Sequence, residues 1–286
     1  MARYAYVNGR YVPHAAARVH IEDRGYQFAD GVYEVILIHE GRLVDEGRHL
    51  DRLDYSLRAL QIPWPMVRPA LQIVLRELIG RNGVTSGTVY LQVTRGVAPR
   101  DHKFPTDAVP SLVATTRRAK PMPPALLTAG VAVVTRFDIR WRRCDIKSIA
   151  LLPNVLGKQA AAEAGAFETW MVDSNGSVTE GTSTNAWIVT RDGRLVTRDL
   201  SSTILAGITR RILLDLARAM NLSLEERAFS VAEAASAAEA FLTSTTSLVL
   251  SVTRIDGQPV GDGLPGPTAK SLRDLYLRHV AESAVR

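Results

Sequence analysis

Short apolar runs separated by tight turns open the chain. Asn8-Gly9 separates residues 4–7 from residues 10–12, and Asn-Gly is the strongest two-residue signal for a β-hairpin. Glu40-Gly41 divides the apolar runs at 33–38 and 42–44 in the same way. The alternation therefore predicts two hairpins within the first 44 residues.

Helical spacing replaces this alternation further along. Leu50, Leu53, Leu57 and Leu60 share one helical face. A second apolar stripe is expected to start near Pro65, a good first-turn residue, and to end at residues 82–83. Its inward positions are Leu71, Val74, Leu75, Leu78 and Ile79. Strands are predicted at 88–94 and 111–115.

A proline-rich stretch divides the pattern into two parts. Three of the four residues 121–124 are prolines, which excludes a regular strand or helix interior there. We expect a small N-terminal α/β domain at 1–117, a linker at 118–124 and a larger C-terminal domain at 125–286. Strands are predicted in the second part at 130–137, 167–172, 187–190 and 194–196, and helices near 154–163, 208–220, 231–239 and 268–280. Strands interrupted by single helices favour an α+β fold with a barrel-like sheet.

Composition narrows the function classes. The chain has 286 residues, of which 46% are hydrophobic and 22% charged, as in ordinary globular proteins. Its net charge of +6 comes from arginines spread along the chain, which argues against nucleic-acid binding. There is no membrane-spanning run and no signal-peptide core, and Cys144 has no intrachain disulfide partner. We expect a cytoplasmic protein without a metal site.

Lys147 is the most informative single residue. It precedes an apolar run at 149–152, where a lysine must reach water, pair with an anion or lose its charge. A neutral lysine amine can form a Schiff base with a carbonyl. The alternative is an ordinary lysine whose stem lies along apolar surface.

Other segments could supply partners for such a lysine. Glu180 precedes small polar residues, and a carboxylate against a ring nitrogen would keep that nitrogen protonated. The segment 204–210 opens an amphipathic helix at Gly207, where free N–H groups can bind phosphate. Hydroxyls at 243–247 could donate to a phosphate. Arg100 and His102, two apart in an extended loop, would suit a carboxylate clamp. Residues 22–34 fit neither helical nor strand periodicity. Each segment alone also has an ordinary reading as a turn, a cap, a strand or a solvated loop.

Together these segments resemble the fold-type IV, pyridoxal-phosphate-dependent aminotransferases, and within them the D-amino-acid aminotransferases. The resemblance covers nearly the whole chain. It rests on the motifs EDRGYQFADGVYEV (22–35), HLDRL (49–53), QVTRG (92–96), PRDHKFP (99–105), RWRRCDIKS (140–148), VTEGTSTN (178–185), ILAGITR (204–210) and LTSTTS (242–247).

The resemblance implies a role for each matching residue. Lys147 would form the Schiff base with pyridoxal 5′-phosphate and transfer protons, and Glu180 would pair with the pyridinium nitrogen. Leu205 would pack against the cofactor ring. The phosphate would be held by Arg52, the backbone of Ile208 and Thr209, and Ser244 and Thr245. The substrate carboxylate would be bound by Tyr33, Arg100 and His102.

The family further implies a two-domain fold with the cofactor between the domains. It also implies a homodimer in which the arginine and histidine of the clamp come from the partner subunit. The implied reaction is a ping-pong transamination between a D-amino acid and a 2-oxo acid such as pyruvate or 2-oxoglutarate.

Two features depart from this pattern. The leucine stripe of the helix at 50–60 predicts that Arg52 faces solvent, so its phosphate role rests on the resemblance alone. Asp101 lies inside the Arg-x-His loop, where a carboxylate could weaken the attraction for a substrate carboxylate.

Four alternatives remain open at this point. A branched-chain L-amino-acid aminotransferase would lack the Arg-x-His clamp. An R-selective amine transaminase would accept substrates without a carboxylate. An aminodeoxychorismate lyase is a further enzyme of this kind. The alternative from another class is a catalytically silent cofactor-binding protein, against which Lys147 and Glu180 argue.

Overall fold

The computed structural model describes residues 3–283 and divides the chain into two compact units. The first unit takes in the chain up to Lys120, Ile146–Ala150 and the segment from Val280 onward, and the second contains Pro121–Asp145 and Leu151–His279. The domain ranges 1–117, 118–124 and 125–286 remain predictions, and their ends at residues 1–2 and 284–286 lie outside the described residues. The sequence pattern did not indicate that residues 146–150 belong with the first unit.

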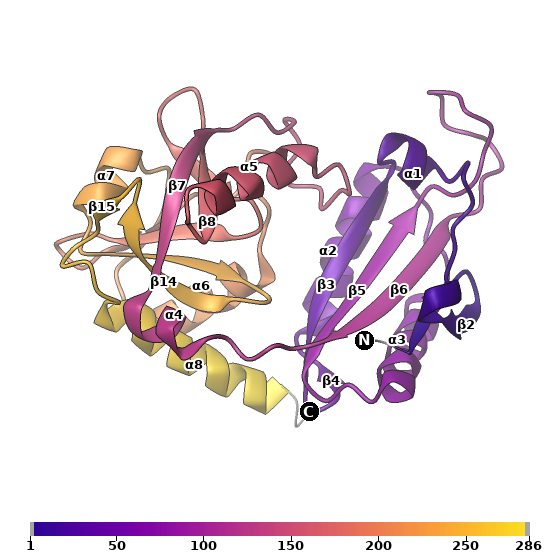
Figure 1. Cartoon of the computed structure of the whole chain (residues 1–286), viewed down its shortest axis with the longest axis horizontal. Coiled ribbons are helices and arrows are strands. Elements are labelled where there is room, and N and C mark those ends of the chain that lie inside the picture. Colours follow the sequence, from indigo (N-terminus) through magenta and orange to yellow (C-terminus); the bar gives the residue numbers. More distant parts are fainter. Residues whose placement is uncertain (1–2, 284–286) are drawn as a thin grey trace. The chain divides into compact units, whose positions relative to one another are not determined.

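The first unit is built on a six-stranded antiparallel sheet (Figure 1) in the order β2-β1-β6-β5-β3-β4. Its strands are β1 (Tyr4–Val7), β2 (Arg10–Pro13), β3 (Gly31–His39), β4 (Arg42–Leu43), β5 (Gly87–Thr94) and β6 (Ser111–Arg118). Its helices are the 3₁₀ turn η1 (His14–Ala16), α1 (Arg24–Phe28), α2 (Glu46–Ala59) and α3 (Arg68–Asn82). The two predicted hairpins are confirmed, because Asn8, Gly9, Glu40 and Gly41 all have positive φ and link β1 to β2 and β3 to β4.

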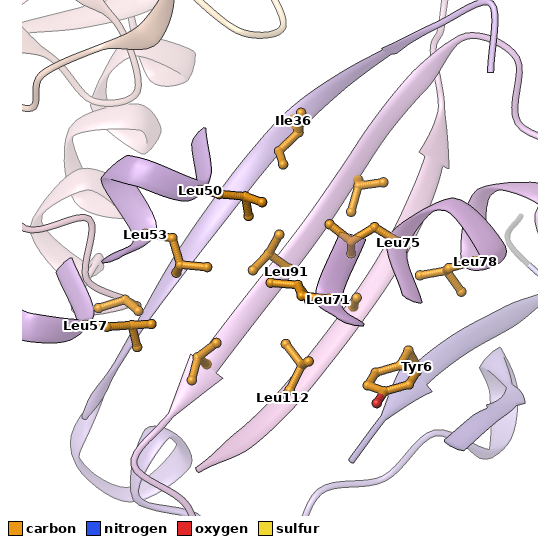
Figure 2. Packing of buried hydrophobic residues seen from close by; sticks show 14 of the residues in the cluster. Tyr6, Ile36, Leu50, Leu53, Leu57, Leu71, Leu75, Leu78, Leu91 and Leu112 are labelled. Atoms are coloured by element: carbon orange, nitrogen blue, oxygen red, sulfur yellow. The ribbon is translucent and has the colours of Figure 1, made fainter. Parts of the chain in front are cut away.

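Leucines of α2 and α3 form the core of this unit against one face of the sheet (Figure 2). They meet apolar side chains from β3, β5 and β6, and the members shown are fully or almost fully buried. Burying each such side chain contributes about 1.5–3 kcal/mol. The labelled members are Tyr6, Ile36, Leu50, Leu53, Leu57, Leu71, Leu75, Leu78, Leu91 and Leu112.

Three local predictions for this unit were wrong. The second helix begins at Arg68 rather than near Pro65, because Pro69 occupies its first turn. Leu60 follows the end of α2 and is only half-buried. Residues 22–34 are not irregular, since they contain α1 and the start of β3.

The second unit is built on a nine-stranded mixed sheet. Its strands are β7 (Val131–Phe137), β8 (Glu168–Val172), β9 (Val178–Gly181), β10 (Asn185–Val189), β11 (Leu195–Thr197), β12 (Leu224–Glu226), β13 (Glu239–Ser244), β14 (Leu248–Ile255) and β15 (Gln258–Pro259). The order β12-β11-β10-β13-β14-β7-β8-β9 leads back to β9, the neighbour of β10 along the chain. The Gly181 N–H donates to the Thr184 carbonyl at 2.7 Å, so the sheet curls on itself as the barrel-like prediction required.

Four described helices and α8 as far as His279 belong to this unit (Figure 1). They are α4 (Pro124–Ala129), α5 (Leu152–Glu163), α6 (Ile208–Ala219), α7 (Val231–Ser236) and α8 (Pro267–Ser283). Strand β9 and helix α4 were not predicted, and the helix expected at 231–239 ends at Ser236 because β13 begins at Glu239. Among the described residues, no helix combines the length and apolar character needed to cross a membrane.

Candidate active site

Lys147 is held by backbone contacts beside the start of β3. The Tyr33 N–H donates to the Lys147 carbonyl at 3.0 Å, and the Lys147 N–H donates to Ser56 Oγ of α2 at 3.2 Å. The Ile149 N–H donates to the Gly31 carbonyl at 3.1 Å. A Cβ on Gly31 would lie 2.8 Å from the Val93 carbonyl oxygen of β5 and 3.0 Å from Ile149 Cδ1, so glycine allows both β5 and the segment after Lys147 to approach this closely.

The Lys147 ammonium lies over the Tyr33 ring, with Nζ 4.3 Å from the ring centroid. Residues of β3 alternate between the two faces of the sheet, so Tyr33 lies on the opposite face from Val32 and Glu34, which are buried with the core. The Tyr90 ring packs 5.7 Å from Tyr33. The structure therefore brings together two predicted site residues, Lys147 and Tyr33, on one face of the first unit.

Arg52 is buried, so the prediction from helical spacing that it faces solvent was wrong. Its Nε donates to Glu34 Oε1 at 2.7 Å and its NH2 group to Glu34 Oε2 at 2.8 Å. His49 Nδ1 lies 2.8 Å from the same Oε2. Burial raises the pKa of Glu34, but Arg52 and His49 outweigh it and lower that pKa to about 2. Burial lowers the pKa of His49. Because Arg52 pairs with Glu34, its charged side chain can be buried on the inward-facing side of α2.

Arg100 and His102 lie on the exposed loop between β5 and β6. The Arg100 guanidinium is 4.6 Å from the centroid of the Phe28 ring, and the His102 ring is 5.5 Å from it in an edge arrangement. The two predicted clamp residues therefore pack against the same aromatic ring of α1. No contact joins them to Tyr33 or Lys147 among the interactions that the described residues show.

Glu180 lies at the end of β9 in the second unit and is buried. Its carboxylate pairs with Arg140 and accepts the N–H of Leu205 and the amide of Asn185, the latter at 3.1 Å. Arg140 also forms a bidentate ion pair with Asp138. Burial lowers the pKa of Arg140, but Glu180 and Asp138 outweigh it and raise that pKa. This unit thus holds Glu180 in place from three directions.

The start of α6 is linked to Glu180 through Asn185. Asn185 donates to the carbonyl of Leu205 at 3.0 Å, and a Cβ on Gly207 would collide with the Asn185 side-chain oxygen. Glycine at 207, the N-cap of α6, therefore leaves the Asn185 side chain in the position from which it bonds Glu180 and Leu205. The first N–H groups of a helix have no acceptor within it and favour an anion, and Ile208 and Thr209 occupy these positions.

The hydroxyl-rich turn between β13 and β14 is tied to the same region. Asn185 pairs with Thr243 across β10 and β13, so Ser244 and Thr245 follow directly from the partner of Asn185. Ser244 Oγ accepts the Ser247 N–H at 3.0 Å, which orders the turn. The second unit therefore brings Glu180, Leu205, the α6 N-terminus and this turn into one connected cluster.

Sequence reasoning did not single out three residues of these clusters. Arg140, Asn185 and Glu34 all lie within the sequence motifs, but none of them was predicted to have a function. A signal existed for Glu34 alone, because a carboxylate at an inward strand position requires a buried partner. No local pattern marks Arg140 as the partner of a residue forty positions away.

Comparison with known proteins identifies the family. Residues 31–255 match the family model described as amino-transferase class IV. The chain is 43% identical to the D-alanine aminotransferase of Bacillus licheniformis over 266 residues, which is 93% of each chain. It is 36% identical to that of Staphylococcus haemolyticus, over 96% of this chain and 97% of the relative. This chain belongs to the class IV aminotransferases, which confirms the resemblance stated from its motifs.

Solved structures show the same fold. The branched-chain amino acid aminotransferase of Escherichia coli matches with a TM-score of 0.91 at 23% identity, covering 98% of this chain and 95% of that one. A second branched-chain amino acid aminotransferase, solved with pyridoxamine 5′-phosphate, also matches with a TM-score of 0.91, at 24% identity and with coverage of 98% and 95%. The predicted fold-type IV architecture is confirmed.

The residues of each unit fit pyridoxal phosphate. Its aldehyde requires an amine, which Lys147 offers. Its ring nitrogen requires a carboxylate, and Glu180 is buried and fixed by Arg140 and Leu205. Its phosphate requires donors, and the N-terminal turn of α6, which Gly207 caps without a side-chain acceptor, offers backbone N–H groups for it.

Proposed function

We propose that this protein is a pyridoxal-phosphate-dependent transaminase that transfers the amino group of D-amino acids, with D-alanine as the type, to 2-oxo acids such as pyruvate or 2-oxoglutarate. The observation that carries the proposal is the identity of 36–43% to D-alanine aminotransferases over nearly the full chain. The Lys147–Tyr33 and Glu180–Arg140 contacts support it. A cytoplasmic location remains a prediction.

Lys147 is the residue that would bear the cofactor and move the proton at the substrate α-carbon. Its backbone is fixed between β3 and α2, so its amine is presented from a rigid position. The cofactor, when bound, supplies an electron sink for that carbon. Glu180, which Arg140 keeps in place, would hold a proton on the ring nitrogen.

The phosphate would be bound by the N-terminal turn of α6 together with Ser244 and Thr245. Arg52, whose guanidinium is already fixed by Glu34, would add a positive charge. Arg100 and His102 would bind the substrate carboxylate, for which arginine offers a bidentate fork.

A parallel assay tests the substrate class. Formation of 2-oxo acid is followed from D-alanine, L-leucine and (R)-1-phenylethylamine with one acceptor. Dominant turnover of D-alanine is expected, and dominant turnover of either other donor would refute the proposal. Protein that stays colourless with added pyridoxal phosphate would instead support a silent protein that lacks the proposed chemistry.

Replacement of the lysine tests the chemistry itself. Lys147→Ala should abolish turnover and the visible absorption of the bound cofactor while leaving the fold intact by circular dichroism. Lys158→Ala is the matched control, because Lys158 is half exposed on α5. Full activity of Lys147→Ala would exclude the assigned role.

A homodimer is part of the proposal. Apolar side chains of the second unit are exposed around a shallow cavity of about 290 Å³ between the end of β7 and α5. Phe137 is 65% exposed, Ile139 58% and Leu156 53%. Contiguous exposed apolar surface of this kind marks protein contacts, and a second copy of this chain is the partner that we propose.

A further inference from the structure

Asp30 connects two buried arginines of the first unit. Its Oδ2 accepts from Arg24 Nε and Arg95 Nε, both at 2.8 Å, and its Oδ1 accepts from the Arg95 NH2 group at 3.0 Å. Arg24 is 3% exposed and Arg95 5%. Asp30, Arg24 and Arg95 are called the Asp30 cluster below.

Burial raises the pKa of Asp30, but Arg95 and Arg24 outweigh it and lower that pKa. The carboxylate therefore stays ionised at neutral pH. Two further donations from Arg95, to the carbonyls of Leu60 and Gln61 at 2.7 and 3.0 Å, fix that arginine to the end of α2. The Asp30 cluster is thus a buried network in which one carboxylate is hydrogen-bonded to both arginines and backbone carbonyls accept their further N–H groups.

Both arginines of the cluster hold the loop that carries Arg100 and His102. The Arg24 NH1 group donates to the carbonyl of Asp101 at 2.5 Å. The Arg95 guanidinium carbon lies 3.6 Å from the centroid of the Phe104 ring. The two arginines therefore contact Asp101, which lies between Arg100 and His102, and Phe104, which lies two residues after His102.

Phe28 completes the support. Its ring lies against Arg24 at 4.8 Å and against Arg100 at 4.6 Å, measured from guanidinium carbon to ring centroid, and the His102 ring packs on its edge. The Asp101 carboxylate accepts the Lys103 N–H at 3.3 Å, so it takes part in the turn of the loop. The exposed loop is therefore anchored to buried charges.

We propose that Asp30 is a positioning residue for substrate recognition: through Arg24 and Arg95 it fixes the loop at 99–105 and thereby sets the affinity for carboxylate-bearing substrates. The inference rests on the proposed function, in which Arg100 and His102 bind the substrate carboxylate. Asp30 itself contacts neither of them in the described interactions, so its effect is indirect.

The first test separates substrate affinity from chemistry. Asp30→Asn keeps the shape and removes the charge that holds both arginines. Misplacing a binding group by about 1 Å can cost up to about a hundredfold, so we expect the KM for D-alanine to rise at least about tenfold. Because Lys147 and Glu180 are untouched, kcat and the absorption of the bound cofactor should stay close to those of the parent enzyme. Equal KM values in both proteins, or a loss confined to kcat, would overturn the proposal.

A second variant covers the case in which Asp30→Asn fails to fold. Phe104→Leu removes only the ring that stacks on Arg95, and a cation–π contact of about 1 kcal/mol corresponds to roughly a fivefold rise in KM. Asp51→Asn is the control, since Asp51 pairs with Arg68 at an exposed site of the same unit. The inference is wrong if Phe104→Leu behaves like this control.

A structural readout needs no turnover. Trypsin can cut after Arg100 and Lys103, and both are exposed. Loosening the anchor should speed cleavage of the holoenzyme at these two bonds in Asp30→Asn, located by mass spectrometry, without faster cleavage elsewhere. Unchanged cleavage would refute the anchor even if D-alanine were not a substrate. Failure of the proposed function would instead appear as a parent enzyme without D-alanine turnover.

Discussion

The buried ion pair of Glu34 predicts a measurable loss of folding stability when its charge is removed. Glu34 is fully buried, and its two oxygens accept from Arg52 at 2.7 and 2.8 Å while His49 Nδ1 lies 2.8 Å away. Glu34→Gln conserves the volume of the side chain but removes its charge. Arg52 is then left as a buried cation without a counter-charge, a change that costs about 3–5 kcal/mol when it breaks a buried pair.

The pH dependence gives an independent magnitude. The pKa of Glu34 falls from its ordinary value of 4.5 to about 2 in the folded state. Because the folded-state pKa is the lower one, the stabilisation is fully present above pH 4.5 and is lost as the pH falls toward 2. The shift corresponds to about 3 kcal/mol in the free energy of unfolding, of which about 2 kcal/mol is lost by pH 3.

Urea unfolding followed by circular dichroism from pH 7 to pH 3 measures both effects. Glu34→Gln should be less stable at pH 7, and its deficit should shrink as the pH falls. Glu77→Gln is the control, since the Glu77–Arg81 pair is exposed and worth at most about 1 kcal/mol. A variant as stable as the parent at pH 7, or a deficit independent of pH, would refute the reasoning.

Single contacts give three further predictions. Gly207→Ala should lower the affinity for pyridoxal phosphate in a spectroscopic titration and reduce the melting temperature, because its Cβ would collide with the Asn185 side-chain oxygen; unchanged affinity would contradict the crowding. Leu156→Glu should shift sedimentation toward the monomer, whereas Ile73→Glu on the exposed side of α3 should not. Glu239→Ala should destabilise the protein by about 1–2 kcal/mol in chemical unfolding, because Glu239 accepts two N–H groups at the start of α8 at 2.9 Å; a smaller change than for Glu77→Gln would argue against this cap.

Elements with a local signal could be predicted from the sequence. The Asn8-Gly9 turn, the leucine stripe of α2 and the stop of α3 at Gly83 all depend on neighbouring residues. Strand β9 was not predicted, because its four residues are too few to show a period and lie between the Asn175-Gly176 turn and the small polar residues after Glu180; pairing with β8 extends them. The secondary structure of such segments is determined by tertiary contacts.

In the candidate site, too, residues within local motifs could be predicted, whereas residues placed by tertiary contacts could not. Lys147, Glu180 and the Arg100–His102 pair were reached from motifs, and Tyr33 does lie against Lys147. Helical periodicity misplaced Arg52, since the amphipathic pattern treats every arginine as polar surface. It takes no account of a buried carboxylate on another element that can pair with it, as Glu34 does.

Buried carboxylate–arginine pairs recur at each cluster and have a shared physical consequence. Glu34 fixes Arg52, Asp30 fixes Arg24 and Arg95, and Arg140 fixes Glu180. Such pairs add little net stability compared with apolar replacements, yet removing one partner is costly. Their value lies in geometry, because a bidentate pair holds both side chains in one orientation. A cofactor phosphate, a ring nitrogen and a substrate carboxylate each require a charge at a defined place. We therefore expect substitutions within these pairs to alter ligand affinity more than substitutions of equally buried leucines with a similar cost in stability.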